Sequence, residues 1–334
     1  WEIKTMTVKL DSFRGCIYVS HKGVELYKQA FGYRDLANKI KNNIKTRFGT
    51  ASAGKAFVGV AILQLIEQEK LSLEDTIGNI LDFDLKQIDP MVTIRQLLTH
   101  TSGVPSYFDE EKVDSYSDLW KDYPNYKVRT NRDLIPLFID LPMRFPRGTK
   151  FEYSDTAFVI LGIIIEMITK KSFDVYMEEA IFKPAKMRHT GYYPMDALPK
   201  NCANHYIYDR EKKSYYTNIY SIDAKGSGAG GAYTTLADIH SFWMHLYKGT
   251  LLSKEMVNEM LSNQSGAAEC YGYAMWLKKI EDRFVPYFEG FDPGATFISM
   301  YDEKEDFISI IMSNYQDDVW DIQVELNRLV YTNF

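Results

Sequence analysis

A serine and a lysine three positions apart, Ser52 and Lys55, offer the clearest chemistry in this sequence. Positions i and i+3 share one face of a helix, so the serine hydroxyl and the lysine ammonium can meet there. A lysine in apolar surroundings loses hydration, and the neutral amine becomes accessible as a base. Such a base would take the serine proton and make the hydroxyl nucleophilic. The helix N-terminus would add free N–H groups that suit a developing oxyanion.

The same pattern also has ordinary explanations. Ser52 could cap the helix, and Lys55 could extend its side chain to water. The pattern Ser-x-x-Lys arises about once by chance in a chain of this length at average composition. A catalytic role for Ser52 therefore needs support from other parts of the sequence.

The element that would hold this pair is a helix expected from Ser52 to about Lys70. Apolar residues occur on every side of it, among them Val58, Ile62 and Leu65. A helix that is apolar all round belongs in the middle of a large domain, and this one is too short and too polar at both ends to span a membrane. We therefore expect the serine at the start of a central core helix.

Strand patterns occur near both ends of the chain. Residues 13–31 predict a hairpin, because polar and apolar residues alternate on each side of a short glycine-containing turn. Charged turns separate four further strand patterns, which predicts an antiparallel meander. These patterns cover residues 271–276, 284–288, 295–300 and 307–312, and a helix is expected after them over residues 319–330. The economical arrangement is an α+β fold in which one antiparallel sheet, built from both termini, is flanked by helices.

The middle of the chain predicts mostly helices. Capped starts are expected at residues 72–75, 93–96 and 234–238, an all-round apolar helix over 158–165, and a further helix over 173–181. We expect a single unit over residues 1–334, with a sheet lobe formed by 1–70 and 265–334 and an inserted, mostly helical lobe over 71–264. Residues 106–133 are polar with interleaved aromatics, which suits either a lid over a site or a loop that packs on its own aromatics.

Two further features have competing explanations. His100 could be a catalytic base, but a histidine hydrogen-bonded at a helix C-terminus explains it as well. Residues 226–231 match the dinucleotide pattern G-x-G-x-x-G. The residues before them do not form a buried strand and no βαβ unit follows, so we interpret them as a flexible loop.

Three motifs occur in a specific order: Ser52-x-x-Lys55, Tyr153-Ser154-Asp155, and Asp292-Pro293-Gly294 just before a strand. Their order and spacing resemble the serine β-lactamase-like superfamily, and within it the branch of class C β-lactamases, D-alanyl-D-alanine carboxypeptidases, penicillin-binding proteins and esterases. The resemblance covers about residues 10 to 330. Further blocks that carry it are residues 97–103, 145–148, 153–162 and 228–235.

The resemblance implies a serine hydrolase that forms an acyl-enzyme without a metal or an organic cofactor. Ser52 would be the nucleophile, and Lys55 and Tyr153 would carry its proton. For Tyr153 to act as the base, its phenol pKa near 10 must fall, which neighbouring ammonium groups would achieve. The oxyanion hole would be the backbone N–H groups of Ser52 and Ala295, and the strand from Ala295 would flank the substrate. The expected substrate-binding residues are Asp155, Asp292, Gly294, Tyr107 and Thr296.

Two residues depart from the family's usual motifs. Asp155 stands where asparagine is usual, and its carboxylate would pair with Lys55, hold it protonated and shift the base role towards Tyr153. Asp292 stands where a lysine or histidine usually binds a substrate carboxylate. Two like charges about 4 Å apart at an effective dielectric near 20 cost on the order of 4 kcal/mol, roughly a thousandfold in affinity. We therefore predict weak β-lactam turnover and favour a neutral ester or amide, or a substrate with a free amine near Asp292, such as a D-amino-acid peptide. A solvated turn residue is the alternative explanation of Asp292.

Composition limits the partners. The net charge of -6 and the pI near 5.6 argue against nucleic acid or an anionic membrane as the main partner. We expect a small-molecule or short-peptide substrate and no obligate membrane segment, and the oligomeric state stays open. Three scattered cysteines do not make a disulfide framework. The chain suits a bacterial soluble protein, either cytoplasmic or extracytoplasmic with an upstream signal or anchor removed.

The altered third motif keeps a second function open. A non-catalytic or slowly acylated penicillin-binding protein, which senses peptidoglycan, would share the motifs but release no product. Slow acylation without turnover would separate this alternative from the hydrolase.

Overall fold

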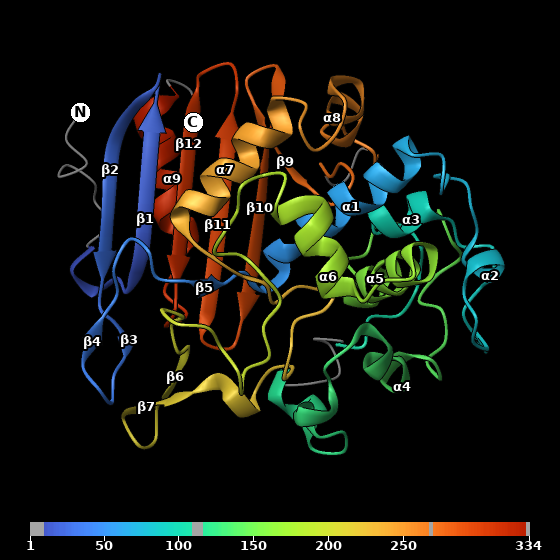
Figure 1. Ribbon diagram of the computed structural model, residues 1–334, viewed down its shortest axis with the longest axis horizontal. Coiled ribbons are helices and arrows are strands. Elements are labelled where there is room, and N and C mark those ends of the chain that lie inside the picture. Colours follow the sequence, from blue (N-terminus) through green and yellow to red (C-terminus); the bar gives the residue numbers. More distant parts are fainter. Residues whose placement is uncertain (1–9, 109–115, 267–269, 332–334) are drawn as a thin grey trace.

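One antiparallel sheet of six strands forms the frame of the molecule (Figure 1). The computed structural model describes residues 10–108, 116–266 and 270–331. Strand β1 pairs along its length with β12, with Gly15 opposite Ser313, so segments from both ends of the chain join in the sheet. The expected α+β fold and the origin of the sheet are confirmed. In spatial order the strands are β2 (Val24–Phe31), β1 (Gly15–His21), β12 (Phe307–Ser313), β11 (Ala295–Asp302), β10 (Arg283–Asp292) and β9 (Trp276–Ile280).

Alternate side chains of the sheet enter two separate cores, one on each face. Ile311 packs in the core that contains α9 (Val319–Val330), whereas its neighbour Ile310 packs in the core that contains α1 (Lys55–Glu67). Helix α7 (Leu236–Tyr247) lies against the sheet on the α1 side (Figure 1), where Trp243 donates a hydrogen bond to Ser299 Oγ at 2.8 Å. The helix expected over residues 319–330 is confirmed.

Helix α1 runs through the middle of the larger core. All its residues from Lys55 to Leu63 are buried. The Phe57 ring lies against three other rings, with centroid distances of 5.4 Å to Phe182, 5.0 Å to Phe242 and 6.2 Å to Phe288. The expectation of a central helix that is apolar all round is confirmed, since no side of α1 is left to solvent over these turns.

Local hydrogen bonds explain where the other helices begin. Thr93 and Gln96 form the capping box expected at the start of α3. The helix start expected at residues 72–75 is wrong, because α2 begins after Thr76 and the Asp75 carboxylate instead closes a turn by accepting from the Ser72 N–H at 2.8 Å. The bounds are α2 (Ile77–Ile80), α3 (Ile94–Leu98), α4 (Ile135–Phe138), α5 (Asp155–Thr169), α6 (Phe173–Met177) and α8 (Lys254–Met260).

The strand expected over residues 271–276 is wrong, because β9 begins only at the last of these residues. The N–H of Tyr273 donates to the carbonyl of Met260, and the N–H of Ala274 donates to the carbonyl of Leu98, at 2.9 and 3.0 Å. Ala274 also has a φ of 58°, in the left-handed region. These backbone groups therefore serve the ends of α8 and α3 and are not available to a strand ladder.

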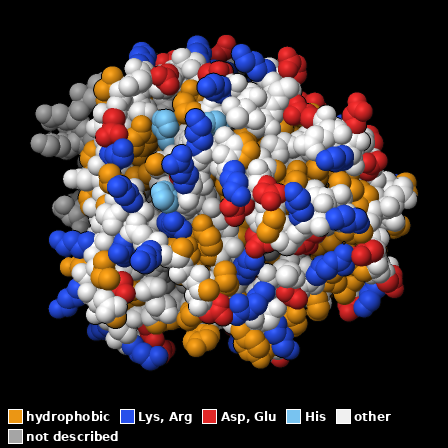
Figure 2. Space-filling view, in the orientation of Figure 1, with side chains coloured by type: hydrophobic (Ala, Val, Ile, Leu, Met, Phe, Trp, Pro, Cys, Tyr) orange, Lys and Arg blue, Asp and Glu red, His pale blue; other side chains and the backbone are white. Residues whose placement is uncertain are grey.

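Short strand pairs connect the helices around the sheet. Their bounds are β3 (Tyr33–Asp35) with β4 (Ile40–Lys41), β5 (Phe48–Gly49) with β8 (Tyr233–Thr234), and β6 (Tyr206–Asp209) with β7 (Ser214–Thr217). In the described part of the chain, no helix has the length and apolar character needed to cross a lipid bilayer. Lysine and arginine side chains are scattered over the face seen in Figure 2, with acidic and apolar side chains between them.

Removing the central ring of the larger core is expected to be costly. Phe57→Ala should lower the free energy of unfolding by about 3–5 kcal/mol, because the ring is fully buried among three others. Phe284→Ala is the matched control, since Phe284 is 39% exposed, and it should change stability by less than about 1 kcal/mol. Urea unfolding followed by tryptophan fluorescence measures both. Equal losses for the two variants would contradict the assignment of α1 to the centre of the core.

Candidate active site

The side chains of Ser52 and Lys55 meet as the sequence predicts. Lys55 Nζ donates hydrogen bonds to Ser52 Oγ at 3.0 Å, to Asp155 Oδ1 at 2.6 Å and to the carbonyl of Ala229 at 2.5 Å. An ammonium has three N–H donors, so every donor of Lys55 has an acceptor. The Lys55 side chain is only 3% exposed. A charge can be buried at acceptable cost only when it is paired and its hydrogen bonds are satisfied, and the carboxylate and two further acceptors around Lys55 meet both conditions.

Ser52 does not lie where the sequence suggested. Helix α1 begins at Lys55, and Ser52 lies in the 3-10 turn Ala51–Gly54 that precedes it. The N-cap of α1 is Gly54 and no side chain caps it, so the capping explanation of Ser52 is wrong. A hydroxyl that is free of a capping bond, next to a lysine, is what a nucleophile needs.

Two glycines allow other segments to pack against this turn. A Cβ atom at Gly290 would lie 2.7 Å from the backbone nitrogen of Ser52, and a Cβ at Gly230 would lie 2.2 Å from the carbonyl oxygen of Ala51. Gly230 belongs to residues 226–231, which the sequence analysis interpreted as a flexible loop. This segment instead packs on the turn, and its neighbour Ala229 supplies a carbonyl to Lys55.

Tyr153 completes the group. It lies just before the N-cap of α5, Ser154, and its hydroxyl shares a hydrogen bond with the Ser52 side chain. Lys55 Nζ is 4.9 Å from the centre of the Tyr153 ring. Burial raises the phenol pKa of Tyr153 well above 10, and the Asp155 carboxylate raises it further. The expectation that neighbouring ammonium groups would lower this pKa is therefore wrong, and Tyr153 is a neutral phenol that can donate a proton.

His100 supports the tyrosine and is not placed as the base. Its Nδ1 accepts a hydrogen bond from the backbone N–H of Ser154 at 3.1 Å, and its ring lies 4.3 Å from the ring of Tyr153. Burial, and secondarily the Lys55 cation, lower the pKa of His100 well below 6.5, so it is neutral. The explanation of His100 as a hydrogen-bonded histidine after a helix is the one that the geometry favours.

The start of β11 lies beside the nucleophile. Asp292 pairs with Ala295 across a two-residue turn, and Gly294 in that turn has a φ of 81°, which favours glycine. Ala295 and Ser52 line the same cleft, as the expected oxyanion hole requires. Thr296 and Gly294 are not among the described residues that line the cleft, in contrast to the substrate-binding role expected of both.

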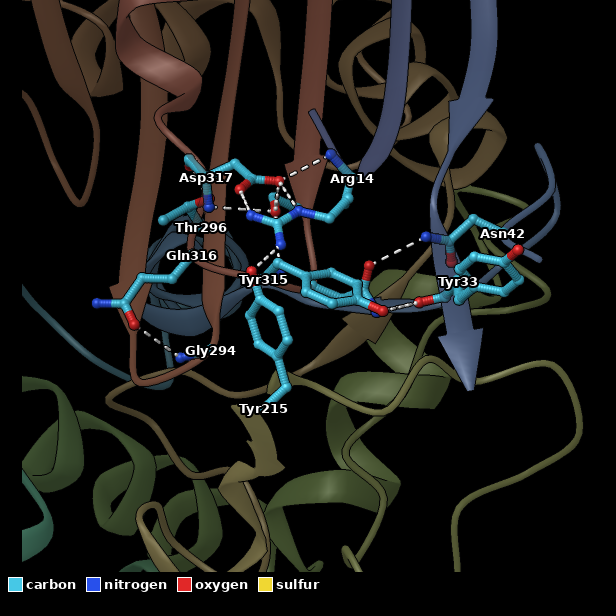
Figure 3. Close-up of polar contacts among 11 residues, drawn as sticks. Arg14, Tyr33, Asn42, Tyr215, Gly294, Thr296, Tyr315, Gln316 and Asp317 are labelled. Carbon is cyan, nitrogen blue, oxygen red and sulfur yellow. Dashed lines mark hydrogen bonds and ion pairs between the residues drawn. The ribbon is translucent and has the colours of Figure 1, made fainter. Parts of the chain in front are cut away.

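A network around Asp317 holds this end of β11 (Figure 3). Thr296 Oγ1 donates to the Asp317 carbonyl at 2.6 Å, and the Gly294 N–H donates to Gln316 Oε1 at 3.3 Å. The Asp317 carboxylate forms an ion pair with Arg14, which precedes β1. The residues on both sides of Ala295 are therefore fixed to the loop before α9, which explains the buried position of the Thr296 side chain.

A cleft of about 1100 Å³ opens at Ser52. The loop that the sequence placed over residues 106–133 supplies Tyr107 and Tyr116 to its wall, while residues 109–115 of that loop lie outside the described part. Tyr107 Oη lies 3.1 Å from Tyr116 Oη, and the Tyr116 hydroxyl donates to Asp223 Oδ1 at 3.1 Å. The lining includes four residues already considered, Asp155, Asp292, Ser52 and Tyr153, and two that sequence reasoning missed, Asp223 and Asn218.

The carboxyl groups of the cleft perturb one another. The pKa of Asp292 is raised to about 8 by burial and then by the carboxylates of Asp223 and Asp155. Burial raises the pKa of Asp223 to about 7. Asp292 is half-buried in the cleft wall, where it ends β10 just before the turn at Pro293 and Gly294. Both groups keep their protons to a higher pH than ordinary carboxyl groups, so the repulsion of a carboxylate expected from Asp292 develops as the pH rises through 7 to 8.

Comparison with known proteins places the chain in a family. The sequence profile of the Beta-lactamase family matches residues 11–328. The chain belongs to the Beta-lactamase family. It is similar to the crystal structure of a penicillin-binding protein from Bacillus halodurans, at 34% identity and a TM-score of 0.90, over 96% of this chain and 97% of that one. It is also similar to a penicillin-binding protein of Bacillus subtilis (strain 168), at 26% identity over 92% of this chain and 69% of that protein.

More distant structures share the fold. A D-amino acid amidase from Ochrobactrum anthropi SV3 has a TM-score of 0.75 at 19% identity, over 94% of this chain and 92% of that one. Membership of the Beta-lactamase family supports a hydrolase activity. Among the described residues, no group of three or more histidine, cysteine or acidic side chains is placed to hold a metal ion.

The raised carboxyl pKa values predict a pH dependence. Binding of benzylpenicillin, which is an anion, to the Ser52→Ala variant should weaken by about tenfold between pH 6 and pH 9, because Asp223 and Asp292 lose protons over that range. Isothermal titration calorimetry measures the affinity. The slope should flatten when Asp292→Asn is added and persist when Asp282→Asn is added, since Asp282 is an exposed acid outside the cleft. Affinity that is independent of pH would contradict the assigned protonation.

Proposed function

We propose that this protein is a serine hydrolase that cleaves an amide or ester bond through an acyl-enzyme on Ser52. The observation that carries the proposal is the contact of Ser52 with both Lys55 and Tyr153 at one end of a large cleft. The cleft accepts a small molecule or a short peptide. The acidic wall favours a substrate without a carboxylate near Asp292, and β-lactams are expected to be poor substrates above neutral pH.

The first half of the reaction removes the serine proton. Lys55 gives one proton to Asp155, 2.6 Å away, and the resulting amine takes the proton of Ser52 as Oγ attacks the substrate carbonyl. A C–O bond forms and the carbonyl electron pair moves to oxygen. The N–H groups of Ser52 and Ala295 stabilise this oxyanion.

The second half expels the leaving group. The bond to the leaving nitrogen or oxygen breaks, and the neutral phenol of Tyr153 supplies the proton that the leaving group needs. Lys55 then returns a proton to Tyr153, and Asp155 returns one to Lys55, so all three groups recover their starting state. Water attacks the acyl-enzyme by the same route and releases the acid.

The similar proteins support the two candidate functions differently. Proteins with the same fold include a D-stereospecific amidohydrolase from a Streptomyces species and the D-amino acid amidase described above, so the fold is compatible with amide hydrolysis. The relatives named as penicillin-binding proteins favour the second candidate, a protein that is acylated slowly and releases no product.

Covalent labelling tests the proposal and separates the two candidates. A fluorophosphonate should add one label per chain, seen by intact mass, and Ser52→Ala should take up none. Wild-type protein should also turn over p-nitrophenyl acetate repeatedly. Labelling with a single burst and no further product would support the slowly acylated binding protein, and equal labelling of Ser52→Ala would exclude both.

Tyr153→Phe should separate two kinds of leaving group. The loss in kcat/KM is expected to be about 10²–10⁴-fold for a p-nitroanilide, whose nitrogen must be protonated as it leaves. It should be at least about tenfold smaller for the matched p-nitrophenyl ester, because p-nitrophenolate leaves without a proton. Tyr126→Phe, at an exposed tyrosine outside the cleft lining, is the control. Equal losses for both substrates would argue against Tyr153 as the acid.

A further inference from the structure

We infer that Asp223, Asp292 and Asn218 form a binding site for a protonated primary amine of the substrate. The inference rests on the proposed hydrolase function and adds the chemical class of its substrate. All three residues line the cleft that opens at Ser52. An ammonium group has three N–H donors, and each of these three side chains carries an oxygen acceptor.

The Asn218 side chain is the observation that points to a ligand. It is 1% exposed, and its Nδ2 donates to the carbonyl of Pro293 at 2.8 Å. This bond fixes the amide orientation, because only the NH₂ end can donate to a carbonyl. Asn218 Oδ1 is buried and has no hydrogen-bond partner among the described residues. Buried acceptors are rarely left unpaired, so an N–H donor from a substrate is the natural partner.

The two carboxyl groups are held in place beside it. Asp292 directly precedes Pro293, the residue to which Asn218 is bonded. Asp223 Oδ1 accepts from the Tyr116 hydroxyl, which in turn contacts the hydroxyl of Tyr107. Both acids line the same cleft, and the carboxylate of Asp223 raises the pKa of Asp292. A cation between them would remove this mutual repulsion.

In the described part of the chain, no ion pair joins a lysine or arginine to Asp223 or Asp292. Among the described residues, Arg144 is the only lysine or arginine that lines the cleft, and its Nε is paired with Glu152 at 2.7 Å. Lys55 lies nearby but has Asp155 as its partner. A substrate ammonium would supply a charge that balances Asp223 and Asp292. A compact ammonium suits a site with three separate acceptor side chains better than a planar guanidinium does.

Three p-nitroanilides test the inference. The two enantiomers of alanine p-nitroanilide carry the amine, and propionyl p-nitroanilide lacks only that group. At pH 7.5 the kcat/KM of the better alanine enantiomer should exceed that of the propionyl compound by about tenfold or more. Asp292→Asn, Asp223→Asn and Asn218→Ala should each lower this ratio towards one. The exposed Asp282→Asn should leave it unchanged. A wild-type ratio near one would overturn the inference.

A binding measurement distinguishes this inference from the proposed function. Calorimetry on Ser52→Ala compares alaninamide with propionamide, and the amine should bind more tightly and release protons from the two acids. Turnover of all three anilides without preference would overturn the amine site and leave the hydrolase standing. Preferential binding without turnover by the wild type would support the site and contradict the hydrolase. Neither turnover nor preferential binding would overturn both.

Discussion

The buried ammonium of Lys55 is the constraint on which the rest of the site depends. A cation that is 3% exposed must have all its donors satisfied, and its three acceptors come from segments far apart in the sequence. Ser52 precedes α1, Asp155 begins α5, and Ala229 lies just before β8. The fold must therefore hold three segments within hydrogen-bond distance of one nitrogen. The close packing of Gly230 and Gly290 on the serine turn is part of that requirement.

The same constraint shapes the electrostatics of the cleft. Asp155 forms an ion pair with Lys55. Asp223 and Asp292 have no lysine or arginine partner among the described residues that line the cleft. Burial then raises their pKa values to about 7 and about 8. The cleft wall that contains Asp223 and Asp292 can therefore change its charge near neutral pH. At the position of Asp292 the family usually has a lysine or histidine. In the proposed hydrolase, substrate choice would follow from this wall and bond cleavage from Ser52 and its neighbours.

The sequence predicted the group formed by Ser52, Lys55 and Tyr153 because motifs report local spacing. Ser52, Lys55 and Tyr153 could be found from i, i+3 geometry and the order of three motifs, and the helix over residues 319–330 from its periodicity. Their protonation could not be found in this way. The phenol pKa of Tyr153 depends on burial and on Asp155, which only the tertiary structure brings together.

Other parts of the site carry no sequence signal. Asn218 begins a short 3-10 helix and Asp223 follows it, in a segment without a motif. Their partners, Pro293 and Tyr116, are distant in the chain. The strand expected over residues 271–276 failed because carbonyls at the ends of α3 and α8 take its N–H groups. A pattern of alternating residues cannot show that competition. Tertiary hydrogen bonds, more than local propensity, decided these positions.

Neutron diffraction from a crystal of the unliganded protein in deuterated buffer near pH 7 tests the central claim most directly, because it locates the hydrogen atoms. The account predicts three deuterons on Lys55 Nζ, directed at Ser52, Asp155 and Ala229, and one deuteron on the Tyr153 oxygen. Two deuterons on Nζ together with a bare phenolate oxygen on Tyr153 would contradict it.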